Sequence, residues 1–583
     1  AVLEAVRAFV GRLLDDPLSR FPDKATAASQ LRINQNLANA ERMQYERAIQ
    51  DYTLSKIGKT WAQTKWGYST EYLNAKLQVE ADLYKISAER DWLKQTGLSD
   101  AEIDARMVDV PEDALKLVHE YERVFNKSAE RAHQQGLLGF ETEFGSAGYV
   151  PRRWVYPALH SLDARHGAGT AVALIQRAIQ KSSPELSDLE TAAIAKAVVE
   201  RSRETATGAR SDFMGQLGNV ETDNIIELMR MGGTDDAIVA SVERKLRQQV
   251  SESAAVSYSK SRIPMDMRTS MVMPDGTEVH LTDLLDTNIS ALMEGYQSSM
   301  AGRSALASIG IGGGEVGVAK FKDDYAKLLY DQGLPRQQIE GMQKQLDSIL
   351  ADFTGIKPDS DILSPIQRSL MDLASATLLS GSGLWQVVET GVILANKGAL
   401  NSLKYMFKNA PGLKSLLKHL GNSSDLHDEL KFVTGLDFAL DPRMQPFLRQ
   451  SEINIGAYTN WQKYTSMSRE FSSTLNGMRW VHGMQARMLT NLNIHDMWKA
   501  ANGDARALRE VMGNGASEGL LDAIRRVSVV ENGSLKGAGL EGLTHAELQE
   551  YLHVLTRMQD SSLLISRPGW GSSFGRSAVG RFL

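Results

Sequence analysis

The chain has 583 residues, of which 42% are hydrophobic and 23% are charged, and its formal net charge is −6. These values are typical of a globular protein long enough for several domains, and they exclude a fibrous or a disordered chain. The absence of cysteine excludes disulfides and cysteine-based zinc sites, and the acidic balance argues against tight binding of DNA, which requires basic side chains to neutralise phosphates.

Residues 25–135 are predicted to form long helices. Apolar and small side chains in this stretch recur at helical spacing and would share one face: Leu73, Leu77, Ala81, Tyr84 and Ala88. Ser99 followed by Glu102 is typical of a capping box, which begins a further helix.

The helical pattern breaks at residues 145–148, and the prolines at 151 and 157 predict a structured loop there. Helices are expected again from about residue 158, one of them begun by a capping box of Ser187 and Glu190. Residues 268–281 are expected to form a β-hairpin, because Pro274-Asp275-Gly276 supplies the turn between two strand-like runs.

Five glycines lie between Gly310 and Gly317, which predicts a flexible linker. The rest of the chain is expected to be helical, with helix starts at Ser364-Pro365-Ile366-Gln367 and at Thr544 with Glu547. We therefore predict a mainly α, multi-domain protein with a small β-hairpin near 268–281. Its expected parts are an N-terminal helical region (1–147), a middle helical domain with the hairpin (148–310), a Gly-rich linker with helices (311–362) and a C-terminal helical domain (363–583).

The two ends predict that this chain is a fragment of a longer polypeptide. It starts with Ala1, and Gly580-Arg581-Phe582-Leu583 stops inside an apolar segment. The charges among the first residues do not fit a signal peptide, although a fragment could have lost one.

Motif searches give no intact catalytic constellation. Residues 571–575 match Gly-x-Ser-x-Gly, but no acidic residue or histidine follows to complete a hydrolase triad. Residues 312–317 match Gly-x-Gly-x-x-Gly in helical surroundings, where a dinucleotide site would need a strand before it. The nearby carboxylates Glu141 and Glu143 are weak glycosidase candidates. We therefore assign this fragment no catalytic residue, no cofactor and no metal site.

Two sets of residues are candidates for contact with other molecules. The uncharged run 373–388 offers Leu384, Trp385, Val387 and Val388 for a membrane or another subunit, or else forms a buried helix pair, because it is short for a spanning helix. Basic side chains are candidates for DNA or lipid headgroups, or else are ordinary solvated charges: Arg152, Arg153, Arg525, Arg526 and Arg576.

Several short motifs follow one another in a fixed order from about residue 145 to the end. They are Gly148-Tyr149-Val150-Pro151-Arg152, Met273-Pro274-Asp275-Gly276, Leu281-Thr282-Asp283-Leu284, Tyr296, Ala301-Gly302-Arg303, Ile366-Gln367-Arg368-Ser369-Leu370, Trp385-Gln386, Glu389, and Phe574-Gly575-Arg576 with Phe582. In this order and spacing they resemble the largest internal virion protein of podophages that carry a protein core inside the head. Residues 1–140 match that family only as a helical stretch.

The resemblance implies a location in the internal core of the virion, around the portal. It implies ejection into the host at infection, and assembly with other internal virion proteins and further copies into a conduit that crosses the periplasm to the inner membrane. Genomic double-stranded DNA would pass through this conduit with only transient contact. A helical chain dominated by local contacts would refold quickly after ejection.

Two other functions stay open at the level of the sequence. Members of this family often carry an N-terminal lytic transglycosylase domain, so the full-length protein could degrade the cell wall through a domain outside this fragment; its motifs are not matched here. A virion-packaged nucleic-acid-binding protein would need a basic groove and an affinity for DNA that falls steeply with salt.

Overall fold

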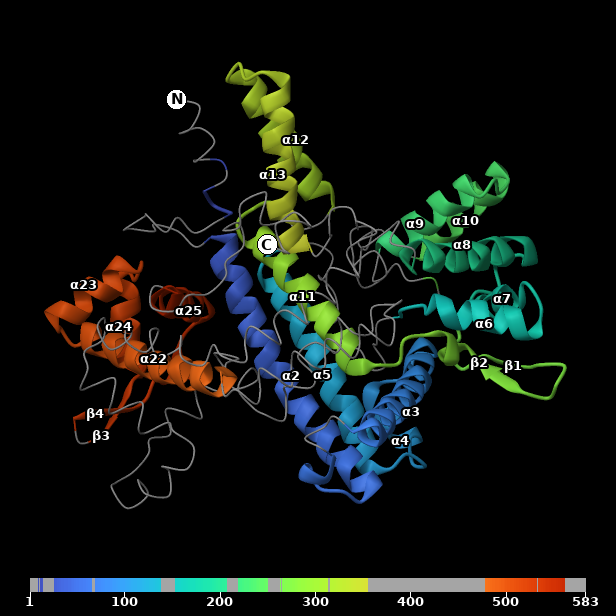
Figure 1. The fold of residues 1–583 in the computed structure, drawn as a ribbon, viewed down its shortest axis with the longest axis horizontal. Helices are drawn as coiled ribbons and strands as arrows, with labels where there is room; N and C mark the ends of the chain where they lie inside the picture. Colours follow the sequence, from blue (N-terminus) through green and yellow to red (C-terminus); the bar gives the residue numbers. More distant parts are fainter. Residues whose placement is uncertain are drawn as a thin grey trace.

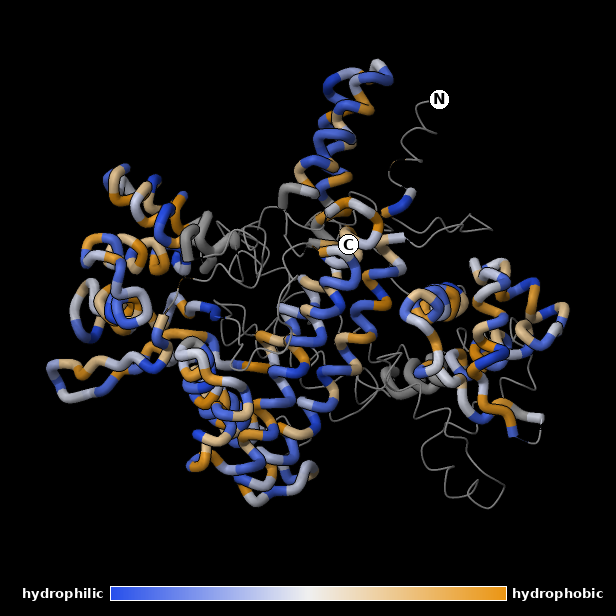
Figure 2. Tube along the Cα trace, turned by 180° about the vertical axis from the view of Figure 1, so that it is seen from behind, coloured by the Kyte–Doolittle hydropathy of each residue, from blue (hydrophilic) through white to orange (hydrophobic). Residues whose placement is uncertain are grey.

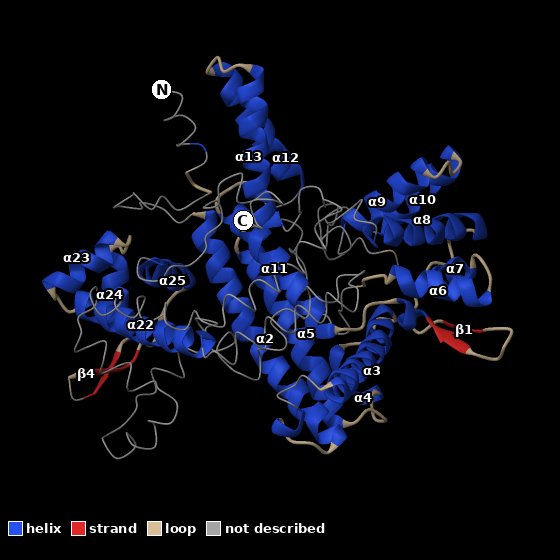
Figure 3. Cartoon of the chain, viewed as in Figure 1, coloured by secondary structure: helices blue, strands red, loops and turns tan. Residues whose placement is uncertain are grey.

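The structure is a computed structural model that describes most of the chain (Figure 1). The described residues are 26–64, 69–137, 152–206, 219–249, 265–312, 315–354, 478–531 and 533–560, with residues 9, 11–13 and 263. Within these ranges there are 16 α-helices and two small antiparallel sheets (Figure 3). The prediction of a mainly α protein with a hairpin near 268–281 is confirmed.

The first helices form the lower centre of Figure 1, and the longest of them, α2, is buried on several sides. Its interior positions include polar side chains such as Asn34, Glu46 and Thr53 as well as apolar ones. By contrast, α5 buries one apolar stripe that includes Leu117, Tyr121 and Phe125. The elements are α2 (Ala27–Ile57), the 3-10 turn η1 (Ala62–Thr64), α3 (Thr70–Gln95), α4 (Asp100–Arg106) and α5 (Glu112–Gln134).

The middle of the chain forms a layer of helices beside the first hairpin. The helices are α6 (Tyr156–His166), α7 (Thr170–Ser182), α8 (Asp188–Ala206), α9 (Asn219–Met231) and α10 (Asp236–Gln249). The hairpin comprises β1 (Ser270–Val272) and β2 (Glu278–His280), with Met271 opposite Val279, and leads into the 3-10 turn η4 (Leu281–Leu284). Its turn needs a left-handed residue, and Gly276 supplies it with φ of 83°.

Helix α11 (Ile289–Ser308) returns to the centre and packs along α2 and α5 (Figure 1). The hairpin of α12 (Glu315–Asp331) and α13 (Arg336–Thr354) follows it and projects from the body. Where α11 crosses α13, the two backbones approach so closely that a Cβ atom on Gly302 would lie 1.7 Å from the carbonyl oxygen of Phe353. Only glycine, which has no Cβ atom, therefore fits at this position without moving the two helices apart.

The last described elements form a small helical lobe against α2. They are α22 (Met478–Ala501), α23 (Ala505–Gly513), α24 (Glu518–Val527), β3 (Val529–Glu531), β4 (Ser534–Gly537), the 3-10 turn η7 (Leu540–Gly542) and α25 (His545–Asp560). The hairpin of β3 and β4 was not predicted, although Asn532-Gly533 at its turn is a strong hairpin signal.

Helix α2 contributes to each of the three largest hydrophobic clusters of the described residues. Tyr45 and Ile49 belong to the largest cluster, which extends along the chain to Met300. Ile33 packs with residues 494–558, and Leu31 packs with residues 301–353. Polar and apolar residues interleave along most helices (Figure 2). The helices are thus also joined by contacts between distant parts of the sequence, although contacts between residues close in sequence remain the majority, as expected.

Local predictions about helix starts are confirmed where the structure describes them. Ser99 and Glu102 form the reciprocal bonds of a capping box. Ser187 with Glu190 and Thr544 with Glu547 do the same. The face predicted for the second long helix is correct in part, since Tyr84 and Ala88 are buried but Leu77 is 39% exposed.

Candidate functional site

The predicted DNA-contact residues Arg152 and Arg153 lie inside the fold. The Arg152 side chain is buried, and its guanidinium donates a hydrogen bond of 2.8 Å to the carbonyl of Ile263. The Arg153 guanidinium forms an ion pair of 3.4 Å with Asp286, and both side chains are largely buried. Because Arg152 is enclosed, its prediction as a surface contact is wrong in this structure; both arginines tie the loop before α6 to neighbouring segments.

Arg525 and Arg526 lie on α24 and are more exposed. Arg525 donates from Nε to the carbonyl of Ala501, at 2.9 Å, and so binds the end of α22, where backbone carbonyls lack helical partners. Arg526 pairs with Glu547 at 2.9 Å. Each side chain is 57% exposed, so contact with DNA or a headgroup stays a prediction for these two.

Other predicted residues lie outside the described part of the chain. These are the membrane or oligomer candidates Leu384, Trp385, Val387 and Val388, the basic candidate Arg576, the weak acid candidates Glu141 and Glu143, and the Gly-x-Ser-x-Gly match at 571–575. Among the residues that the structure does describe, no helix is both long and apolar enough to cross a membrane.

The glycine-rich run at 310–317 connects two helices, α11 and α12. A dinucleotide site requires a strand before such a run, and none is present here. Gly317 packs so tightly that an added Cβ would lie 2.4 Å from the carbonyl oxygen of Ile311. The glycines therefore permit a close helix–helix connection. Across the described ranges, no group of three or more His, Asp or Glu side chains could hold a metal ion.

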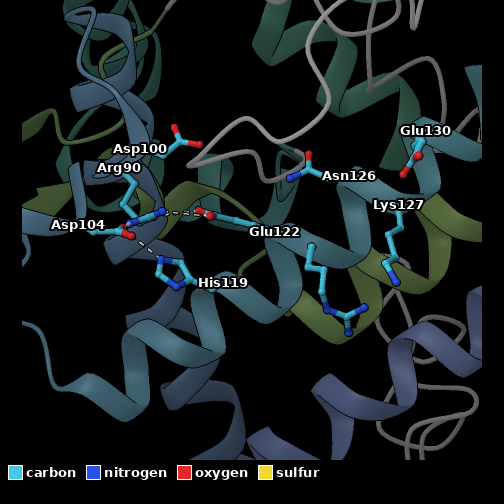
Figure 4. Close-up of a pocket in the computed structure, with 9 residues that line it drawn as sticks. Arg90, Asp100, Asp104, His119, Glu122, Asn126, Lys127 and Glu130 are labelled. Atoms are coloured by element: carbon cyan, nitrogen blue, oxygen red, sulfur yellow. Dashed lines mark hydrogen bonds and ion pairs between the residues drawn. The ribbon is translucent and has the colours of Figure 1, made fainter. Parts of the chain in front are cut away.

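A polar depression of about 490 Å³ lies between α3, α4 and α5 (Figure 4). Arg90 is at its base, with 2% of its side chain exposed. Its guanidinium holds the Glu122 carboxylate with two bonds of 3.0 and 3.2 Å and also contacts Asp104. The Nε2 atom of His119 lies 3.1 Å from the same Asp104.

The electrostatics of this depression do not favour acid catalysis. Burial acts to raise the pKa of Asp104, but the bonds from Arg90 and His119 outweigh it and leave that pKa below its ordinary value. A general acid needs a proton at working pH, whereas Asp104 is held ionised. Four carboxylates and three basic side chains line the depression, so its charge is nearly balanced and does not attract phosphate.

A second polar cluster is enclosed where α2, α3 and α11 meet. We call it the ionic junction, and it consists of Arg42 and Glu46 on α2, Lys76 and Glu80 on α3, and Ser290 and Glu294 on α11. The amino group of Lys76 lies 2.9 Å from Glu80 and 3.8 Å from Glu46, and all three side chains are at most 1% exposed. Arg42 pairs with Glu294 at 3.3 Å.

The contact between Lys76 and Ser290 resembles the nucleophile and base of some hydrolases. The lysine donates to the serine hydroxyl at 2.6 Å. The hydroxyl in turn donates to Glu80 at 2.6 Å, and the amide of Ser290 donates to the same carboxylate oxygen at 3.0 Å. Ser290 and Lys76 are both buried, so a substrate could not reach them in this conformation. The arrangement instead caps the start of α11 with a carboxylate from α3.

The sequence was compared with models of protein families and with curated proteins, and neither comparison finds a significant match.

Proposed function

We propose that the chain is part of an internal virion protein of a bacteriophage, ejected with the genome to build a conduit across the host envelope. The supporting observation is the position of the motifs that carry the family resemblance: several of those in the described residues lie at contacts between segments, while Pro274-Asp275-Gly276 forms the exposed turn of the first hairpin. Arg152 binds the Ile263 carbonyl, Tyr296 contacts Phe125 edge to face with ring centroids 5.2 Å apart, and Gly302 admits Phe353.

Motifs at such contacts specify the shape of a scaffold, whereas the motifs of an enzyme would gather around a pocket. A conduit depends on shape, because each subunit must present fixed surfaces to its neighbours. Repeated head-to-tail contacts between identical subunits produce a ring when the rotation closes. Two hairpins, β1–β2 and α12–α13, project from the body (Figure 1) and could reach neighbouring subunits.

The proposed partners follow from this role. They are other internal virion proteins, further copies of the chain, the core around the portal before infection, and the host inner membrane afterwards. The net charge of −6 suits a wall past which DNA slides, since few phosphates would be held by basic groups.

Electron microscopy of the purified chain, mixed with the other internal virion proteins and with liposomes, tests this proposal. We expect rings or tubes with an open centre, and the chain without its partners serves as the control. Isolated monomers without contact to partners or liposomes would contradict it. DNA affinity that falls steeply with salt would instead favour a packaged nucleic-acid-binding protein.

A further inference from the structure

The ionic junction contains two buried carboxylates, Glu80 and Glu46, that differ in the hydrogen bonds they accept and in their distance from Lys76. Glu80 Oε1 accepts three hydrogen bonds, from Lys76 at 2.9 Å, from the Ser290 amide at 3.0 Å and from the Ser290 hydroxyl at 2.6 Å. Glu46 has fewer partners: it shares the Ser290 side chain with Glu80, and its Oε2 atom lies 3.8 Å from Lys76 and accepts no hydrogen bond from the described residues. The second oxygen of Glu80 also accepts none there. The two carboxylates thus share Lys76, whose amino group lies closer to Glu80 than to Glu46.

This inequality determines which carboxyl group binds a proton. Ionised carboxylates in a protein interior are costly unless they are paired and hydrogen-bonded. Glu80 meets that condition through one oxygen, and it also lies at the positive end of the α11 helix dipole. Glu46 is 1% exposed and has weaker support, from the Ser290 side chain that it shares with Glu80. Burial raises the pKa of Glu46 more than Lys76 and Arg42 lower it, and the charge of Glu80 adds to the rise.

We propose that the ionic junction is a proton-operated switch: Glu46 takes up a proton as the pH falls, which tightens the packing of α2 against α3 and α11, and its ionisation as the pH rises loosens that packing. The switch belongs to the isolated chain, so its test needs neither partners nor membranes.

The direction follows from linkage between proton binding and folding. A carboxyl group whose pKa is raised by folding binds more protons in the folded state than in the unfolded one. Its contribution to stability is present below the ordinary carboxyl pKa and is lost as the pH rises through the raised value. The ionic junction should therefore be tighter in mild acid than at neutral pH, opposite to the behaviour of most ion-paired carboxylates.

The neighbouring groups do not reverse this direction. Asp286, just before α11, also has a pKa raised by burial, which exceeds the lowering by Arg153, and so it acts in the same sense. Burial raises the pKa values of three nearby tyrosines further above their ordinary value of 10.0, beyond the range in question. The titratable and charged groups that interact with Glu46 are Arg42 and Tyr45 from α2 and Tyr72, Lys76 and Glu80 from α3. Around them, Tyr121 from α5 acts on Tyr45, Asp286 before α11 interacts with Glu80, and Glu294 from α11 pairs with Arg42.

Hydrogen exchange read by mass spectrometry tests the switch, with protection factors corrected for the intrinsic effect of pH. In the unaltered chain we expect peptides of α2 and α3 to be better protected near pH 5.5 than near pH 7.5, because the raised pKa of Glu46 stabilises the fold at the lower pH. Glu46→Gln should have the acid level of protection at both pH values. Glu80→Gln should lower protection at both, because it removes the negative charge that pairs with Lys76 and with the N-terminus of α11.

Glu89→Gln is the matched control, since Glu89 lies on the same helix α3 but is 40% exposed; it should behave as the unaltered chain does. Equal protection of the unaltered chain at both pH values, or a lower protection of Glu46→Gln at both, would overturn the proposal. If Glu46→Gln does not fold, infrared spectroscopy of the unaltered chain tests the proposal instead. A protonated carboxyl band near pH 5.5 that persists in Asp286→Asn supports the switch, and its absence refutes it.

Discussion

Glu190 shows how one side chain can both cap its own helix α8 and join it to α10. Its carboxylate accepts from Lys245 at 2.7 Å, from the Ser241 hydroxyl at 2.6 Å, and from the Ser187 amide at 2.7 Å. Burial acts to raise its pKa, but the bonds from Lys245, Ser241 and Ser187 outweigh it and lower the pKa from 4.5 to about 2. The capping box predicted from the sequence is therefore also the anchor of α10 on α8.

We predict that Glu190→Gln lowers the free energy of unfolding of this layer by about 2–3 kcal/mol near neutral pH. Because folding depresses the pKa of Glu190, its contribution is complete above the ordinary value of 4.5 and is lost as the pH falls toward about 2. Chemical denaturation at several pH values measures this. A difference between variant and unaltered chain that does not shrink in acid would contradict the assignment.

Gly302 is a second residue at which one added atom, the Cβ of alanine, is expected to change the stability of the fold. We predict that Gly302→Ala destabilises the chain by about 1–3 kcal/mol, because the new methyl group would meet the backbone of Phe353 and force α11 and α13 apart. Gly341→Ala is the matched control on α13, since a Cβ there meets nothing within 4 Å. Alanine at this helical position should stabilise by about 0.5–1 kcal/mol. Thermal unfolding of both variants tests the pair, and changes of the same sign would count against the crossing geometry.

At the scale of elements, sequence signals were reliable where the cause is local. The three capping boxes depend on residues three apart, and the first hairpin depends on Pro274-Asp275-Gly276. The hairpin at Asn532-Gly533 carried an equally local signal that was overlooked. The helical conformation of α2 was predictable, but the partners of its buried polar residues were not. Arg42, Glu46 and Asn34 pair with residues on α3 and α11 and just after α5, which periodicity within one helix cannot reveal.

The first hairpin is joined to α3 by a contact that the sequence could not indicate. The guanidinium of Arg268 lies 3.5 Å from the ring centroid of Trp92, and it pairs with Asp266 at 3.1 Å. We predict that Arg268→Lys weakens this contact by about 0.5–1 kcal/mol, because an ammonium group lacks the planar face that stacks on indole. A double-mutant cycle with Trp92→Leu measures the coupling. Additive effects of the two substitutions would mean that the stacking contributes nothing.

For the whole molecule, the fold class was predictable but the connections between its parts were not. The C-terminal lobe docks on α2, where His553 lies 3.0 Å from Gln30, a residue 523 positions earlier. The sequence contains no sign of such pairings, because a helical stripe shows that a face is buried and not what covers it. Pairings between such distant segments close long loops, which slows folding relative to contacts between neighbouring segments.

Ile33 is the buried residue of α2 in the hydrophobic cluster of the lobe. It is 2% exposed and packs into the cluster of residues 494–558. We predict that Ile33→Ala costs about 2–4 kcal/mol and lowers the hydrogen-exchange protection of 489–558, because the cavity lies at the contact between lobe and α2. The matched control is Ile175→Ala on α7, which is equally enclosed but belongs to the largest cluster. It should destabilise its own layer and leave the lobe protected, since the two sites share no neighbours. Equal loss of lobe protection in both variants would mean that the chain opens as one unit, and the lobe could then not move separately during assembly.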